Sequence, residues 1–120
     1  DCKYSSLYNT NAEGFEGNKF INCVVGFETN LLVSELQKHL KKIELKMGRT
    51  EDQKGMSNRV IDLDIILYGD QVIKEKNFNL PSKDIEDYIF VLEPLAEIAG
   101  DIKHPVSKQT FLSLLSKMKS

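Results

Sequence analysis

The pattern of apolar and polar residues predicts three strands of useful length. Residues 3–10 read as a strand, and residues 20–29 are β-branched and aromatic, which is typical of a strand. Residues 60–68 give the strongest strand pattern in the chain. The connecting segments are a polar loop over 11–19, a turn at Gly69-Asp70 and then a short partner strand at Val72-Ile73.

A helix is expected between the second and third strands. Ser34 and Gln37 have the spacing of a capping box, and Gly48 is a natural end of the helix. The apolar stripe of this helix consists of Leu36, Leu40, Ile43 and Met47. A polar, glycine-containing loop is expected to follow over Arg49–Asn58.

The last third of the chain reads as helical. Pro94 interrupts residues 84–99, which predicts two short helices rather than one. A terminal helix is expected over residues 108–119. The order of two strands, a helix, a strand and then helices indicates an α+β or α/β protein with a mixed sheet, in one domain over residues 1–120.

Composition and charge exclude several classes of protein. The 120 residues carry a net charge of −2, with 41% hydrophobic and 28% charged residues. These values do not fit a disordered tail, a collagen-like repeat or a strongly basic nucleic-acid binder. We expect no membrane span and, with Cys2 and Cys23 as the only cysteines, a cytoplasmic protein without a disulfide framework.

Asp62 and Asp64 are the sharpest chemical feature, because aspartate is disfavoured inside strands. Their spacing places both carboxylates on one strand face, about 7 Å apart along the backbone, opposite apolar residues that include Ile65. Two such carboxylates suit Mg²⁺, which takes one or two carboxylates and completes its shell with phosphate and water. The alternative is an exposed sheet face with two solvated aspartates.

The only two arginines, Arg49 and Arg59, border the polar loop that ends at the aspartate pair. A guanidinium matches phosphate oxygens in a way that lysine does not. This pattern favours a loop that covers Mg²⁺-bound phosphates, whereas the alternative is that both arginines are surface charges.

Phe20 and Asn22 share one face of their strand, where a ring and an amide could stack on a flat heterocycle and bind its edge. The alternative is a core phenylalanine and a polar strand residue. His39 and His104 have no partner at metal-binding spacing, so we expect structural roles for both. The glycine-rich phosphate-binding motifs are absent from the sequence.

The segment Arg59-Val-Ile-Asp-Leu-Asp-Ile-Ile-Leu-Tyr-Gly69 closely resembles the signature of the 6-hydroxymethyl-7,8-dihydropterin pyrophosphokinases of the folate pathway. The resemblance extends to nearly the whole chain. Its other parts are Ser5–Thr10, Phe20-Ile21-Asn22, Ile43-Glu44-Leu45 through Gly48-Arg49, and Phe90–Leu95.

The resemblance implies an α+β fold with a ferredoxin-like mixed or antiparallel sheet and helices packed on it. It also implies transfer of diphosphate from ATP to the hydroxymethyl group of the pterin, with release of AMP. The implied site residues are Asp62 and Asp64 as Mg²⁺ ligands, Arg49 and Arg59 near the phosphates, Arg59 and Ile65 at ATP, and Thr10, Phe20, Asn22 and Phe90 at the pterin.

The chain departs from the family pattern at several positions. Met56, Ser82 and Tyr88 stand where the family usually has Trp, His and Arg, and the family's first strand and helix are missing from this sequence. A catalytically impaired pterin- or nucleotide-binding relative is therefore the competing hypothesis. The expected partners are the two small-molecule substrates, with no nucleic acid and no membrane, and a monomer is expected with an oligomer left open.

Overall fold

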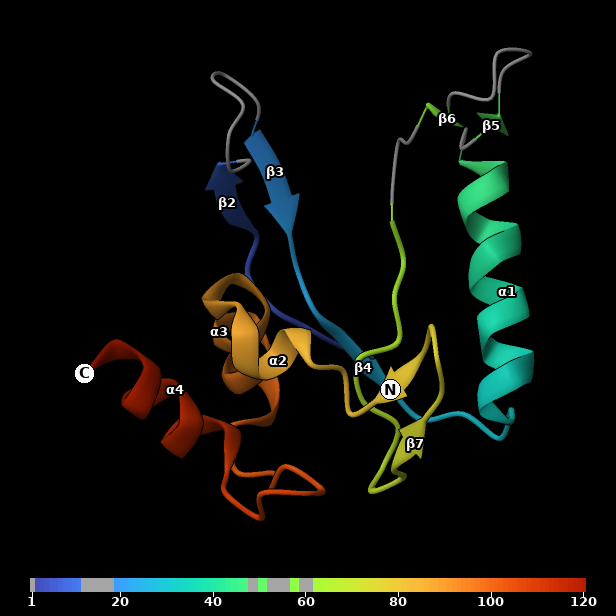
Figure 1. Cartoon of the computed structure of the whole chain (residues 1–120). Coiled ribbons are helices and arrows are strands. Elements are labelled where there is room, and N and C mark those ends of the chain that lie inside the picture. The colour runs from blue at the N-terminus through green and yellow to red at the C-terminus, as the bar shows by residue number, and fades with distance from the viewer. Residues whose placement is uncertain (1, 12–18, 48–49, 52–56, 59–61) are drawn as a thin grey trace. The chain divides into compact units, whose positions relative to one another are not determined.

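The computed structural model describes residues 2–11, 19–47, 50–51, 57–58 and 62–120 (Figure 1). The chain forms two compact units: a larger unit of Asp1–Glu28 with Ile66–Ser120, and a smaller unit of Thr29–Ile65. The strands are β1 (Cys2–Tyr4), β2 (Tyr8–Asn11), β3 (Lys19–Asn22), β4 (Val25–Phe27), β5 (Thr50–Glu51), β6 (Ser57–Asn58), β7 (Ile73–Lys74) and β8 (Asn79–Leu80). The helices are α1 (Val33–Lys46), α2 (Asp84–Asp87), α3 (Ile89–Ala99) and α4 (Phe111–Lys119).

In the larger unit, the two predicted N-terminal strands are each divided in two. β1 pairs with β4 and β2 pairs with β3, both antiparallel. The break lies at Ser5, which is buried and whose hydroxyl accepts a hydrogen bond from the Val24 backbone N–H at 2.8 Å. Three residues of one strand oppose two of the other at this point, as in a β-bulge. The prediction of continuous strands over 3–10 and 20–29 is therefore wrong in the middle of each.

The predicted strand over residues 60–68 is wrong for the part that is described. Residues 62–68 belong to no strand, while residues 60 and 61 lie outside the described residues. The expected partner pairs elsewhere, because Ile73 lies opposite Leu80 in the β7–β8 hairpin. A strand needs a hydrogen-bonded neighbour as well as a favourable sequence, and the pattern of the sequence shows only the second.

The helical part of the larger unit contains two short helices, as predicted, but the break lies at Tyr88 rather than at Pro94. Tyr88 has extended backbone angles (φ −130°, ψ 122°), whereas Pro94 lies inside α3 and is buried. The terminal helix begins after Thr110, whose side chain accepts a hydrogen bond from the Ser113 N–H at 3.2 Å. Thr110 is thus an N-cap that the sequence analysis did not single out.

The hydrophobic core of the larger unit lies where α2, α3 and α4 meet. Its buried members are Ile85, Leu92, Leu95, Ala96 and Phe111. Val24, next to β4, and Ile66 and Leu67, in the segment after the aspartate pair, pack against this core. The core therefore fixes the helices relative to the base of the strands in this unit.

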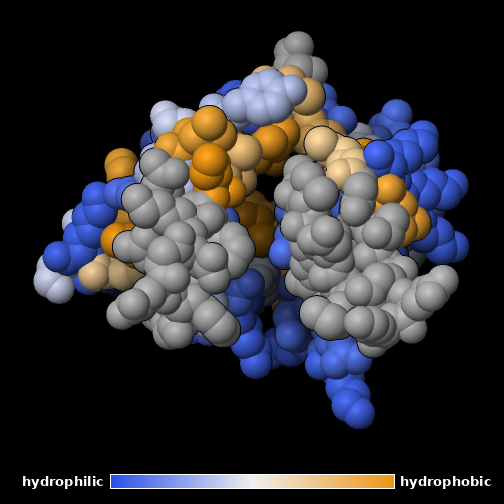
Figure 2. Space-filling model, turned by 90° about the horizontal axis from the view of Figure 1, so that it is seen from above, coloured by the Kyte–Doolittle hydropathy of each residue, from blue (hydrophilic) through white to orange (hydrophobic). Residues whose placement is uncertain are grey.

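In the smaller unit, α1 begins two residues earlier than expected and uses a different cap. The backbone N–H of Leu32 donates to the Glu35 carboxylate at 3.0 Å, so the capping box predicted for Ser34 and Gln37 is wrong. Leu36 is buried, but Ile43 and Met47 are exposed to 43% and 50%. Figure 2 shows that hydrophobic residues are also exposed on the face seen from above. Half of the predicted apolar stripe is thus not buried among the described residues.

The polar segment expected to be a loop over 49–58 contains a short strand pair. Thr50 lies opposite Asn58 and Glu51 opposite Ser57, in the antiparallel pair of β5 and β6. The prediction of a loop is therefore wrong at both ends of the segment. The residues between these strands lie outside the described part of the chain.

The α+β class is confirmed, and each strand pair in the described residues is antiparallel. The ferredoxin-like arrangement of one sheet stays a prediction, as does the assignment of residues 1–120 to a single domain. Within the described part of the chain, every helix is too short or too polar to cross a bilayer.

Candidate functional site

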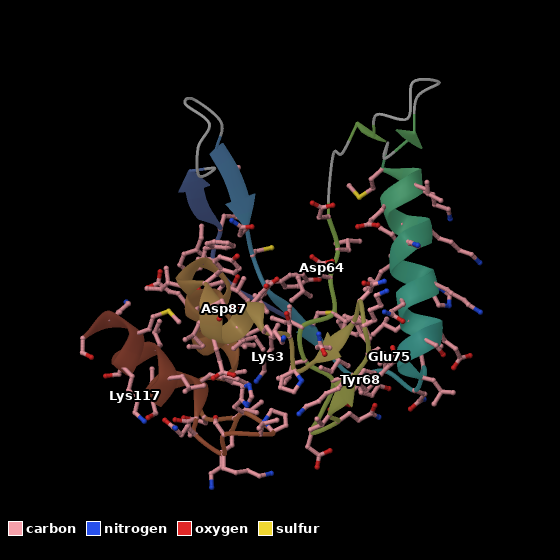
Figure 3. All side chains as sticks on the ribbon, in the orientation of Figure 1. Lys3, Asp64, Tyr68, Glu75, Asp87 and Lys117 are labelled. Carbon is pink, nitrogen blue, oxygen red and sulfur yellow. The ribbon has the colours of Figure 1, made fainter. Side chains whose placement is uncertain are left out.

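The aspartate pair lies in the smaller unit, in an extended segment without strand pairing. Along this segment exposure alternates: Asp62 and Asp64 are exposed, whereas Leu63 and Ile65 are half-buried. Asp64 projects on the side away from α1 (Figure 3). The alternation that the sequence predicts is therefore kept although the strand is not, and both carboxylates are accessible to a ligand.

A third carboxylate, Glu44 of α1, holds the backbone between the two aspartates. The N–H of Leu63 donates to Glu44 Oε2 at 2.7 Å, and Glu44 is only 4% exposed. A hydrogen bond from a backbone N–H to a buried carboxylate is among the stronger ones in proteins. Glu44 therefore fixes the part of the chain that presents Asp62 and Asp64, a role that the sequence analysis missed.

The predicted pterin-binding residues of the N-terminal region lie on one hairpin of the larger unit. In the register of β2 and β3, Thr10 lies opposite Phe20 and Tyr8 lies opposite Asn22. Opposite residues of an antiparallel pair share a face, and so do residues two apart. The four positions thus belong to one face of the hairpin.

The fourth predicted pterin residue, Phe90, lies in the first turn of α3. It is half-buried, and its ring stacks on Tyr88 with centroids 4.9 Å apart and planes at 25°. In a stacked pair of this kind one face of the Phe90 ring is covered by the ring of Tyr88. Tyr88, which stands where the family usually has Arg, therefore supports the ring of Phe90.

The hairpin and α3 are joined by Glu97. Its carboxylate accepts from the Ser6 backbone N–H at 2.9 and 3.0 Å, from the Ser6 hydroxyl at 2.9 Å and from the Tyr8 hydroxyl at 2.7 Å. The Tyr8 hydrogen bond, followed by those of Ser6, lowers the pKa of Glu97. The same hydrogen bond raises the pKa of Tyr8 to about 12. Near neutral pH the acceptor is thus ionised and the donor keeps its proton.

The structure describes several of the predicted site residues only in part or not at all. Arg49 and Arg59 lie outside the described residues, as does Met56. For Thr10 and Phe20 the backbone pairing is described, and their side chains are not. The structure therefore groups the aspartates in one unit and the hairpin with Phe90 in the other.

The larger unit also contains a cavity of about 280 Å³ that includes none of the predicted site residues. His104 lines it and is buried, and its Nδ1 accepts from the backbone N–H groups of Val106 and Ser107. Its Nε2 lies 3.3 Å from a carboxylate oxygen of Glu86. His104 therefore holds a turn together, which agrees with the structural role predicted for it.

The residues at the aspartate pair suit a magnesium ion that also binds phosphate. No cluster of three or more His, Cys, Asp or Glu side chains is found among the described residues, so a cage made by the protein alone is not seen there. Mg²⁺ does not need such a cage, because water and phosphate oxygens can fill most of its shell. Two accessible carboxylates fit this requirement.

Comparison with known proteins identifies the family. Residues 1–100 match the family described as 7,8-dihydro-6-hydroxymethylpterin-pyrophosphokinase. The chain belongs to this family. The matched region contains the hairpin, α1, the aspartate pair and all of α3, so every predicted site residue lies inside it.

Curated relatives in the pyrophosphokinase family have names that agree with this assignment. The chain is 39% identical over 108 residues to the 2-amino-4-hydroxy-6-hydroxymethyldihydropteridine pyrophosphokinase of Aquifex aeolicus, covering 89% of this chain and 67% of the relative. It is 36% identical to the enzyme of the same name from Synechocystis, covering 95% of this chain and 58% of the relative. It is also 35% identical to the folic acid synthesis protein fol1 of Pneumocystis carinii, covering 97% of this chain and 16% of the relative. The chain thus spans between a sixth and two thirds of the length of these relatives.

Proposed function

We propose that this pyrophosphokinase-family chain transfers diphosphate from ATP to the hydroxymethyl group of 6-hydroxymethyl-7,8-dihydropterin in folate biosynthesis. The hydroxyl oxygen attacks the β-phosphorus, the bond from that phosphorus to the bridging oxygen of the α-phosphate breaks, and AMP leaves with that oxygen. The hydroxyl proton is released to solvent. The family match over residues 1–100, with two accessible aspartates inside the signature segment, carries this proposal.

Asp62 and Asp64 are the proposed ligands of Mg²⁺. When bound, the ion would neutralise phosphate charge and hold ATP near the acceptor hydroxyl. Glu44 keeps the backbone between the aspartates in place, which supports a fixed direction for both carboxylates. On the basis of the family resemblance alone, Arg49 and Arg59 are proposed to lie near the phosphates, and Arg59 and Ile65 to contact ATP.

The pterin is proposed to bind between the hairpin and α3. Tyr8 reaches Glu97 of α3, so the hairpin face that includes positions 20 and 22 is directed at that helix. Phe90 lies two helical turns before Glu97, on roughly the same side of α3. This placement supports stacking of a flat ring between Phe20 and Phe90, with Asn22 at its edge.

We propose a ferredoxin-like sheet for the complete family fold, a cytoplasmic location, and small molecules as the only partners. None of the relatives named above is described as a non-catalytic binding protein, so enzyme activity is the function that we propose.

An assay with ATP, MgCl₂ and 6-hydroxymethyl-7,8-dihydropterin tests the proposal directly. We expect AMP and the pterin diphosphate to form in equal amounts, and EDTA to stop the reaction. Binding of the pterin without AMP release would favour the impaired relative instead. Absence of both binding and turnover would contradict the proposed function.

Phe20→Ala should weaken pterin binding about tenfold, because stacking of an aromatic side chain on a base is worth about 1–3 kcal/mol. Affinity for ATP should stay unchanged. Fluorescence titration with the pterin measures the effect, and Phe27→Ala is the matched control, since Phe27 is an exposed ring on β4. Equal pterin affinity in Phe20→Ala and the wild type would mean that Phe20 is an ordinary core residue.

A further inference from the structure

We infer that Glu97 is a positioning residue that sets the distance between the pterin-binding hairpin and α3; this inference rests on the proposed function. Glu97 accepts hydrogen bonds from three different groups of the N-terminal segment, namely the Ser6 backbone N–H, the Ser6 hydroxyl and the Tyr8 hydroxyl. Its donors lie 89 and 91 residues away in the chain, so the contact closes a long loop. Glu97 is therefore placed to fix the hairpin relative to α3, the two elements between which the pterin is proposed to bind.

The hydrogen bonds of Glu97 hold the hairpin at two positions, Ser6 and Tyr8. Ser6 lies in the three-residue link between β1 and β2, next to the bulge at Ser5. Tyr8 is the first residue of β2 and the register partner of Asn22. By holding Ser6 and Tyr8, the carboxylate controls both the point where the hairpin leaves the body of the larger unit and the face that it turns toward α3.

The helix that carries Glu97 is itself fixed. The neighbours Leu95 and Ala96 belong to the buried core, and Leu92 is fully buried one turn earlier. The ring of Phe90 is held by Tyr88 at the start of the same helix. Because α3 is held by the core, loss of the Glu97 contacts should displace the hairpin rather than α3.

The chemistry of the junction favours a fixed geometry over the working pH range. Glu97 is ionised because its pKa is lowered, and Tyr8 remains a donor because its pKa is raised to about 12. One carboxylate with converging donors has few alternative arrangements, unlike a single surface ion pair. In the proposed reaction Glu97 contacts neither the hydroxyl oxygen of the pterin nor the β-phosphorus of ATP. Its effect on the reaction therefore depends on the position of the hairpin.

The test compares Glu97→Ala and Glu97→Gln with the wild type. Glu97→Ala should raise the KM for the pterin and its Kd about tenfold, with the KM for ATP unchanged, because the hairpin face loses its fixed place. Glu97→Gln should recover part of this loss, since its amide oxygen can still accept from Ser6 or Tyr8. Glu93→Gln is the matched control, because Glu93 lies one turn earlier on α3 and pairs with Lys119 at 2.7 Å.

A measurement without ligand separates this inference from the proposed function. Hydrogen exchange should show faster exchange at the Ser6 amide and in β2 and β3 of Glu97→Ala, with α3 and α4 unchanged. Faster hairpin exchange together with weaker pterin binding supports the positioning role. Unchanged pterin affinity in Glu97→Ala, or an equal rise in the KM values for the pterin and for ATP, overturns the positioning role. A wild-type protein that binds no pterin would instead refute the proposed function.

Discussion

Replacement of Asp62 or Asp64 by alanine is expected to reduce AMP formation by about 10³-fold or more, with the fold preserved. Each aspartate is exposed, so its removal should leave no cavity and change the free energy of unfolding by no more than about 0.5 kcal/mol. The proposed diphosphate transfer, by contrast, depends on neutralising the charge of the transferred phosphates. Loss of a metal ligand there removes several kcal/mol of transition-state stabilisation, and each 1.36 kcal/mol corresponds to about a factor of ten in rate.

The measurements are the rate of AMP release over a range of MgCl₂ concentrations, and thermal unfolding of each variant. Higher MgCl₂ should recover part of the activity of Asp62→Asn or Asp64→Asn, because an amide oxygen is a weaker ligand than a carboxylate. Asp70→Asn is the matched control, since Asp70 is an exposed carboxylate in the turn that follows the signature segment. Turnover at the wild-type rate in both alanine variants would contradict the metal-binding role.

The sequence predicted the local pattern at the aspartate pair better than the strand that was to carry it. Exposure alternates over residues 62–65 as period 2 requires, because side-chain direction depends only on an extended backbone. The strand itself depends on a hydrogen-bonded neighbour, and the residues nearby in sequence pair among themselves as β7 and β8. Pairing of strands is a tertiary property, and a single segment contains little information about it.

For the helices too, the features set by local sequence were predicted and the feature set by tertiary packing was missed. Their positions along the chain were predicted within a few residues, since periodicity and capping act over one or two turns. The break at Tyr88 was missed because Pro94 is the stronger local signal, while burial of Pro94 in the core allows α3 to continue through it. A proline inside a helix costs one backbone hydrogen bond, and packing can offset that cost.

The two carboxylates that we propose as positioning residues, Glu97 and Glu44, differ in what the sequence could predict of them. Glu97 could not have been found from the sequence, because its hydrogen-bond donors are about 90 residues away. Glu44, by contrast, has a signal in the sequence. Leu36, Leu40 and Glu44 follow one another at four-residue spacing, so a charged residue occupies the buried face of α1. A charge at such a position is rarely buried without a partner, and here the partner is the N–H of Leu63.

Glu44→Leu is therefore expected to lower kcat about 100-fold without removing any group that touches a substrate. The substitution leaves the backbone N–H of Leu63 without its acceptor in a half-buried segment, which costs about 1–3 kcal/mol of stability. The segment between the aspartates can then shift, and a displacement of about 1 Å is enough to cost about 100-fold in rate. The concentration of MgCl₂ needed for half-maximal activity should rise at the same time.

Glu44→Gln separates the positioning role from a general loss of stability. Its side-chain oxygen can still accept from Leu63, so kcat should stay within a few-fold of the wild type. Glu35→Gln is the control for loss of a carboxylate from α1, because Glu35 accepts from the backbone of Leu32 at the other end of the helix. If Glu44→Leu is destabilised but keeps both the wild-type kcat and its MgCl₂ dependence below the melting temperature, the aspartates do not depend on Glu44 for their direction. A fall in kcat in Glu44→Leu and its recovery in Glu44→Gln would show that the buried hydrogen bond between Glu44 and Leu63 sets the position of the proposed metal ligands.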